Sequence, residues 1–209
     1  EEIIEEKDYS FITVSMGEGM TETFKSLGVD FVVAGGQTMN PSTEDLLKGV
    51  DKVGGKVIYL IPNNSNIILS AEQARDISNR EIIVIPSKSV PQGIAAMLAF
   101  NEEASKEENE ENMIEAIGSV IDASVTYAVR DTTINGKEIH KDDIIGIASK
   151  DIISSGKTVF DVVTETVDKL MDEDISLVTL FYGEDVKEED AEEVREAIEE
   201  KYPDIDIDV

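Results

Sequence analysis

The chain has 209 residues, enough for one large or two modest domains, and 41% of them are hydrophobic, which is ample for packed cores. Its 46 acidic and 18 basic side chains give a formal net charge of −28, which repels phosphate backbones and anionic bilayers. Nucleic acid and membrane surfaces are therefore not expected as partners. The chain has no cysteine and one histidine, which excludes disulfides and leaves little for a zinc site.

No apolar run approaches the roughly 20 residues that span a bilayer, and the acidic start has no basic region of the kind that opens a signal peptide. We therefore expect a cytoplasmic protein without stable membrane insertion. The first residue is not Met, so we expect a fragment or a processed chain.

The first half repeats one pattern four times, a short apolar strand, a polar turn and a helix. The strands are predicted at residues 11–15, 30–34, 57–61 and 81–85, and the helices follow each of them. The run at 57–61 is apolar throughout, which is typical of a strand buried on both faces. Strands that alternate with helices favour a parallel sheet with helices on its faces, so residues 1–101 are predicted to form a parallel α/β lobe.

The second half follows a different pattern. Residues 102–112 are predicted to be a charged connection. Residues 113–209 then combine helices near 113–121, 158–171 and 187–200 with strands near 125–129, 144–148, 175–182 and 204–209. Asn135-Gly136 is typical of a two-residue hairpin turn. The predicted fold class is therefore α/β in two lobes, the first a parallel sheet flanked by helices and the second a mixed α+β sheet with an antiparallel hairpin.

The candidate binding residues are the turns that follow the predicted parallel strands, because ligands of open parallel sheets bind beyond the carboxyl ends of the strands. These turns are polar and nearly uncharged in a strongly acidic chain, and they offer amide groups to a phosphate or to a partner's loop. Ordinary turn and capping residues would have the same composition, so this alternative stays open. The candidates are Gly35, Gly36, Gln37, Thr38, Asn40, Ser42, Asn63, Asn64, Ser65, Asn66, Ser87, Lys88, Ser89 and Gln92.

Two glycine motifs are rejected as phosphate loops. Gly17-Glu-Gly19 has Glu22 where a dinucleotide fingerprint needs a third glycine, and Gly156-Lys157-Thr158 has Asp151 where a P-loop needs its first. His140 lies among charged residues near the predicted hairpin, a surface setting. The acidic pairs at 187–190 and 204–208 lack the glycine and the final glutamate of a calcium loop. No catalytic and no metal residues are therefore assigned.

Longer runs carry a family resemblance. "GGQTMNPSTEDLL" (35–47), "IPNNSNIILSAEQA" (61–74), "VPQGIAAMLAFN" (90–101) and "VTLFYGEDVKEEDA" (178–191) resemble the C-terminal region of the catalytic subunit of bacterial fatty acid kinase, which is related to the dihydroxyacetone kinases. In dihydroxyacetone kinases a histidine holds the substrate covalently, but the setting of His140 does not match that role.

The resemblance implies a non-catalytic region that docks a separate fatty-acid-binding subunit, whose acyl carboxylate is then phosphorylated elsewhere. ATP and magnesium are implied for an N-terminal domain that this sequence does not contain, so no cofactor is expected here. The parent protein would be a kinase and this region inactive alone. A homodimer of the parent protein stays open, as do two alternative functions, an independent small-molecule or lipid-binding domain of DegV-like type and an autonomous enzyme.

Overall fold

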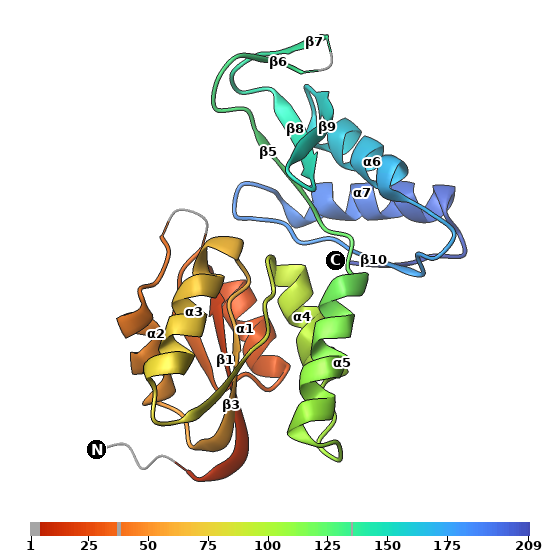
Figure 1. Ribbon diagram of the computed structural model, residues 1–209. Coiled ribbons are helices and arrows are strands. Elements are labelled where there is room, and N and C mark those ends of the chain that lie inside the picture. Colours follow the sequence, from red (N-terminus) through yellow and green to blue (C-terminus); the bar gives the residue numbers. More distant parts are fainter. Residues whose placement is uncertain (1–4, 37–38, 135) are drawn as a thin grey trace. The chain divides into compact units, whose positions relative to one another are not determined.

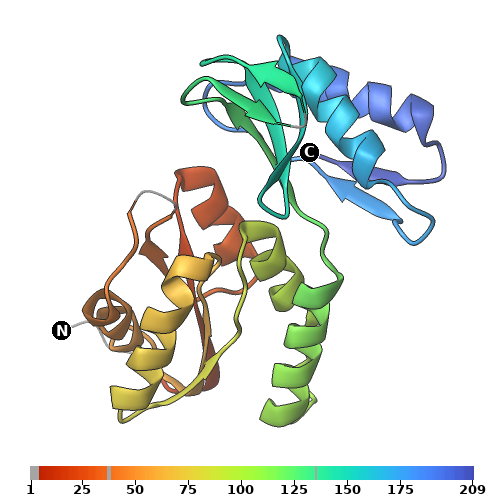
Figure 2. The ribbon, with the colours of Figure 1, turned by 45° about the horizontal axis from the view of Figure 1, so that its top comes forward.

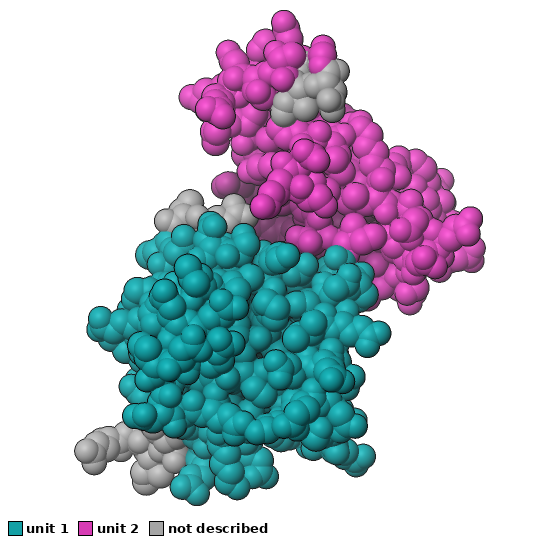
Figure 3. Space-filling view, in the orientation of Figure 1, with its two compact units in different colours: residues 1–120 teal, residues 121–209 magenta. Residues whose placement is uncertain are grey.

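The computed structural model describes residues 5–36, 39–134 and 136–209, and the chain divides into two compact units, residues 1–120 and 121–209 (Figure 3). Unit 1 contains a sheet of four strands, β1 (Lys7–Ser15), β2 (Phe31–Ala34), β3 (Gly55–Ile61) and β4 (Glu81–Val84). Their order in the sheet is β2-β1-β3-β4, and all three neighbouring pairs are parallel. The predicted parallel α/β lobe is confirmed.

The helices of unit 1 cover both faces of this sheet (Figures 1 and 2). Helices α2 (Thr43–Val50) and α3 (Ser65–Ile77) pack on one face. Helices α1 (Glu18–Ser26), α4 (Val90–Ala99) and α5 (Lys106–Ser119) pack on the other. Successive residues of β3 alternate between the two cores, Ile58 and Leu60 into the first, Tyr59 and Ile61 into the second. This double burial is the reason for the unbroken apolar run.

The division between the two units does not fall in the predicted connection at 102–112, because helix α5 belongs to unit 1. Its first turn has a capping box, in which Ser105 and Glu108 each accept a hydrogen bond from the other's backbone N–H. Its Met113 and Ile117 are buried in the core beneath α4. Because these two apolar residues belong to the first core, the charged stretch before them is the solvated start of a helix of unit 1, and the division falls after residue 120.

The described residues of unit 2 form three separate sheets and two helices. An antiparallel sheet has the order β5-β8-β9, from β5 (Ala123–Tyr127), β8 (Ile144–Ala148) and β9 (Asp151–Gly156). β6 (Thr132–Ile134) and β7 (Lys137–Ile139) form the predicted antiparallel hairpin, although Asn135 of its turn lies outside the described residues. β10 (Leu177–Thr179) and β11 (Asp206–Asp208) form a parallel pair. The helices are α6 (Val159–Leu170) and α7 (Glu188–Lys201).

Three details of unit 2 differ from the sequence predictions. The strand β9 was not predicted, because the polar pair Ser154-Ser155 interrupts its apolar residues. The strand expected at 175–182 is only three residues long, and its Leu177 is exposed rather than buried. Helix α6 buries Val162 and Thr166, whereas the helical spacing of its apolar residues predicts a buried face one position away, made of Val159, Phe160, Val163, Val167 and Leu170. By contrast, the helical spacing of Ala191, Val194 and Ile198 predicts the apolar stripe of the helix at 187–200, and these three residues are buried in α7.

Candidate functional site

The strand order of unit 1 places a topological switch point between β1 and β3. β2 lies next to β1 on one side of it, and the chain then crosses over so that β3 and β4 lie on the other side of β1. In open parallel sheets the crevice at such a point, beyond the carboxyl ends of the strands, is the usual ligand site. Those predicted site residues that the structure describes follow the carboxyl ends of β2, β3 and β4, so the fold brings them to the same edge of the sheet.

The side chain of Asn63 fills the inner part of this crevice. Its Nδ2 donates to Thr13 Oγ1 of β1 at 2.8 Å and to the carbonyl oxygen of Val14 at 3.0 Å. Its Oδ1 accepts from Ser87 Oγ at 2.9 Å, and its backbone N–H donates to the same hydroxyl at 2.9 Å. Asn63 is 8% exposed and has a φ of 57°, a left-handed conformation that asparagine tolerates well. Asn63 and Ser87 therefore join the ends of β1, β3 and β4.

Gly93 of α4 lies directly against this asparagine. A Cβ atom at Gly93 would be 2.0 Å from Asn63 Oδ1, well inside van der Waals contact. The glycine thus lets the first turns of α4 approach the crevice closely. We call this arrangement, in which the buried Asn63 side chain occupies the switch point against Gly93, the closed crevice.

Several other predicted residues cap helices. Ser42 forms a capping box with Asp45 at the start of α2, and the Ser42 hydroxyl and N–H hold the pKa of Asp45 below its usual value. Asn64 accepts from the N–H of Asn66 at the start of α3, and Ser89 accepts from the N–H of Gln92 at the start of α4. These contacts fix the turns.

The turn after β2 is held by a close backbone contact. A Cβ at Gly35 would be 2.6 Å from Pro41 Cδ, so only glycine fits there. Gly36 and Met39 exchange two backbone hydrogen bonds across the turn. The predicted residues Gln37 and Thr38 lie outside the described residues.

The exposed residues of this edge form what we call the tip surface. Sequence reasoning missed its two apolar members, Met16, which is 48% exposed, and Met39, which is 55% exposed. A methionine in a turn carries no signal of its own, so the fold was needed to identify them. Within the predicted turns 17–19, 35–42, 63–66 and 87–92, Glu18 and Lys88 are the charged residues. The tip surface consists of Met16, Gly17, Glu18, Gly19, Met39, Asn40, Ser42, Ser65, Asn66 and Lys88.

One buried hydroxyl at this edge lacks a partner. Ser15 ends β1 and is 4% exposed, and its Oγ has no hydrogen-bond partner among the described residues. Leaving such a group unsatisfied costs about 1–3 kcal/mol.

The remaining motifs do not form phosphate or metal sites in the described parts of the chain. Gly156 ends β9, Lys157 pairs with Asp143, and Thr158 caps α6 by accepting from the N–H of Asp161. His140 is exposed, with Nδ1 3.9 Å from Asp131 Oδ1. No group of three or more His, Asp or Glu residues could hold a metal ion there. Nor does any helix among these residues have the length and apolar character to cross a membrane.

Comparison with known proteins agrees with the resemblance seen in the sequence. The family model for the C-terminal region of FakA-like fatty acid kinase proteins matches residues 10–209. Protein YloV of Bacillus subtilis is 43% identical over 201 residues, 96% of this chain. An uncharacterised protein of Staphylococcus aureus (strain USA300) is 41% identical over 206 residues, 99% of this chain. The chain spans only 36% and 38% of these two proteins.

A solved structure has the same fold. It is a DegV-family protein from Ruminococcus gnavus, refined with vaccenic acid, at a TM-score of 0.68 and 13% sequence identity. The match covers 98% of this chain and 92% of the other. At this identity the likeness establishes the fold.

Proposed function

Because this chain belongs to the FakA-like C-terminal family of fatty acid kinases, we propose that it is the non-catalytic region that docks the fatty-acid-binding subunit of such a kinase. In this proposal the partner's acyl carboxylate is phosphorylated by a separate ATP-binding domain of the parent protein. The parent is then a phosphotransferase, related to the dihydroxyacetone kinases, and this region acts by holding the partner in place.

The observation that carries the docking proposal is the tip surface of unit 1. Neutral amides, hydroxyls and methionine side chains lose their water at much lower cost than carboxylates, and protein interfaces are depleted of Asp and Glu in their centres. In a chain with a net charge of −28, the tip surface is a nearly neutral area. Met16 and Met39 add flexible apolar contacts, which suit a surface that packs against another protein.

The rigidity of the turns supports the same role. The helix caps at Ser42, Asn64 and Ser89 hold the turns, and the network around Asn63 ties the strand ends together. A surface that is already ordered loses little conformational entropy when a partner binds. The closed inner crevice also favours an outer, protein-sized partner over a small molecule inserted between β1 and β3.

The test measures association with a purified fatty-acid-binding kinase subunit by biolayer interferometry. Asn66 is exposed in the first turn of α3, so Asn66→Trp adds bulk to the tip surface without removing a cap. We expect it to weaken binding by at least about tenfold, the effect of losing about 1.4 kcal/mol. The matched control is Asn112→Trp, at an exposed position of α5, which should leave the affinity unchanged.

A second control concerns charge. Glu193 is exposed on α7, and Glu193→Gln should also leave the affinity unchanged, because the acidic terminal helix is not part of the proposed surface. If Asn66→Trp binds as tightly as the parent chain, the tip surface is not the docking site. If neither the parent chain nor any variant binds the fatty-acid-binding subunit, the docking role itself is refuted.

The DegV fold favours a second candidate, an independent lipid-binding domain. The supporting observation is the vaccenic acid in the Ruminococcus gnavus structure of the same fold. Native mass spectrometry of this chain after incubation with vaccenic acid separates the two candidates. A stoichiometric one-to-one complex, formed without any partner protein, would favour lipid binding by this chain, whereas the docking proposal expects none.

A further inference from the structure

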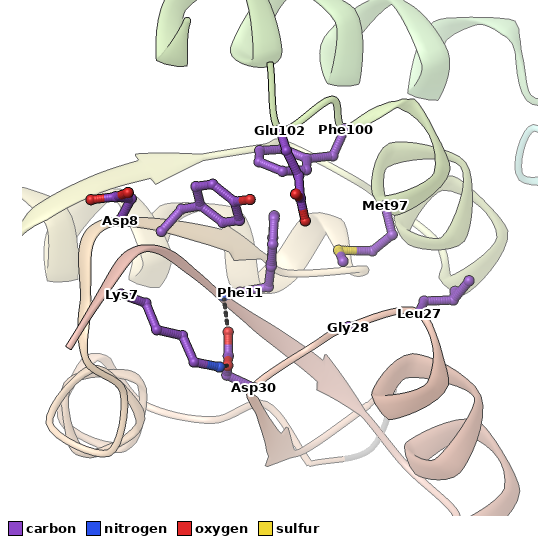
Figure 4. Close-up of a pocket in the computed structure, with 10 residues that line it drawn as sticks. Lys7, Asp8, Phe11, Leu27, Gly28, Asp30, Met97, Phe100 and Glu102 are labelled. Atoms are coloured by element: carbon purple, nitrogen blue, oxygen red, sulfur yellow. Dashed lines mark hydrogen bonds and ion pairs between the residues drawn. The ribbon is translucent and has the colours of Figure 1, made fainter. Parts of the chain in front are cut away.

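A hollow of about 520 Å³ lies at the end of the unit 1 sheet where the strands begin, near the amino end of β1 and away from the tip surface (Figure 4). Three segments that are distant in sequence line it, the start of β1, the turn between α1 and β2, and the end of α4 with the segment that follows it. The proposed docking role uses none of these residues. Their chemistry is a combination of aromatic rings and carboxylates.

Aromatic rings form the wall of the hollow. The Tyr9 and Phe100 rings meet edge to face with centroids 4.6 Å apart, and Phe11 meets Phe100 in the same way at 4.8 Å. Tyr9 and Phe100 are half-buried, so each ring keeps some surface that a ligand can contact, whereas Phe11 is buried. Aromatic faces carry the negative part of the ring quadrupole and attract cations.

The carboxylates around the hollow differ in how they are paired. Asp30 accepts from Lys7 Nζ at 2.7 Å and from the Phe11 N–H at 2.9 Å, so its charge and hydrogen bonds are used within unit 1. Asp8 is 2.7 Å from Lys56 Nζ on the neighbouring strand. Glu102 has no cationic partner among the residues that the structure describes.

Glu102 belongs to the same hollow as the aromatic rings. In Figure 4 its side chain points from the segment after α4 into the space beside Phe100. Burial, together with the Glu102 carboxylate, raises the pKa of the Tyr9 hydroxyl. A carboxylate without a cationic partner therefore stands beside the Tyr9 hydroxyl and next to partly accessible aromatic rings.

We propose that this hollow binds an arginine side chain from a basic segment of a partner protein. A guanidinium group is planar, so it can lie against the Phe100 or Tyr9 ring while its N–H groups reach the Glu102 carboxylate. Charge complementarity supports a basic segment, because three carboxylates and one ammonium line the hollow and the whole chain carries a net charge of −28. Such a field speeds the approach of a positively charged segment.

The test titrates the intact chain with a blocked tri-arginine peptide and follows backbone amide signals by NMR. We expect saturable binding with the largest shifts at Gly28 and Glu102, which belong to two of the segments that line the hollow. Glu102→Gln should lower the affinity for the peptide by about fivefold, the usual upper range for the loss of one exposed ion pair. Glu103→Gln is the matched control, since the neighbouring Glu103 is exposed and outside the hollow, and it should change nothing.

Two further arms separate the hollow from general charge attraction. A tri-citrulline peptide has nearly the same shape without charge and should not bind. Phe100→Leu keeps an apolar side chain but removes the ring, so it should lower the affinity for the arginine peptide about two- to fivefold. Equal weakening by Glu102→Gln and Glu103→Gln, equal binding of tri-citrulline, or shifts spread along α7 would each overturn the proposal.

Discussion

Gly93→Ala tests the closed crevice of unit 1 most directly. The added Cβ would be 2.0 Å from Asn63 Oδ1 and 2.7 Å from Asn63 Cγ, so the asparagine side chain has to move. In moving it loses its bonds to Thr13, Val14 and Ser87. At about 1 kcal/mol net for each bond, the loss is about 3 kcal/mol. Alanine regains up to about 1 kcal/mol as a better helix former, so unit 1 should be destabilised by about 2–3 kcal/mol.

The matched control is Gly118→Ala in α5. A Cβ at Gly118 would meet nothing within 4 Å, so only helix propensity acts there and the substitution should stabilise unit 1 by up to about 1 kcal/mol. The free energy of unfolding of unit 1 is measured from hydrogen exchange of peptides that cover β3. If both alanines change stability by the same amount and in the same direction, the contact with Asn63 does not exist as described.

A double-mutant cycle then isolates the contact itself. Asn63→Gly removes the side chain and keeps the positive φ of 57° without strain. In that background Gly93→Ala meets no obstacle, so it should stabilise unit 1 by up to about 1 kcal/mol, as Gly118→Ala does. We expect a coupling energy of about 3 kcal/mol, because the gain in helix propensity cancels in the cycle, and this lies at the upper end of the range measured for residues in direct contact. A coupling near zero would contradict the proposed origin of the Gly93→Ala effect.

Two further predictions concern unit 2. The amides of β11 should exchange about a hundredfold faster than those of β3, because β11 has three residues paired with β10 whereas β3 pairs with both β1 and β4; equal exchange rates would refute this. Calorimetry with ATP and magnesium should give no binding to this chain, because Lys157 is paired with Asp143 and Thr158 is used as a helix cap, and micromolar affinity would contradict it.

Much of unit 1 could be predicted because its signals are local. An unbroken apolar run at 57–61 specifies a strand with two buried faces, and the four repeats of strand, turn and helix specify a parallel sheet. Because parallel strands end on the same side of the sheet, the turns that follow them were expected to meet at one edge. The apolar stripe of α7 at Ala191, Val194 and Ile198 could also be predicted from the spacing of its apolar residues.

The parts that could not be predicted depend on distant contacts. Asparagine after a strand is typical of an exposed turn, and the burial of Asn63 depends on Thr13 and on Gly93, which lie 50 residues before it and 30 after it. In unit 2 the apolar pattern of α6 did not identify Thr166 as buried. Its Oγ1 lies 2.6 Å from Ser154 Oγ, and a Cβ at Gly146 would be 2.1 Å from that serine oxygen. A polar pair of this kind gives no hydrophobic signal.

The closed crevice also constrains what unit 1 can bind at its switch point. A ligand that enters between β1 and β3 has to displace the Asn63 side chain and lose about 3 kcal/mol of hydrogen bonding, a penalty of roughly a hundredfold in affinity. A protein that packs on the tip surface displaces nothing, and it benefits from turns that are already fixed. Asn63→Gly should therefore let a small ligand of the crevice bind more tightly, whereas a docked partner should bind somewhat more weakly, because the turns are then less ordered before binding.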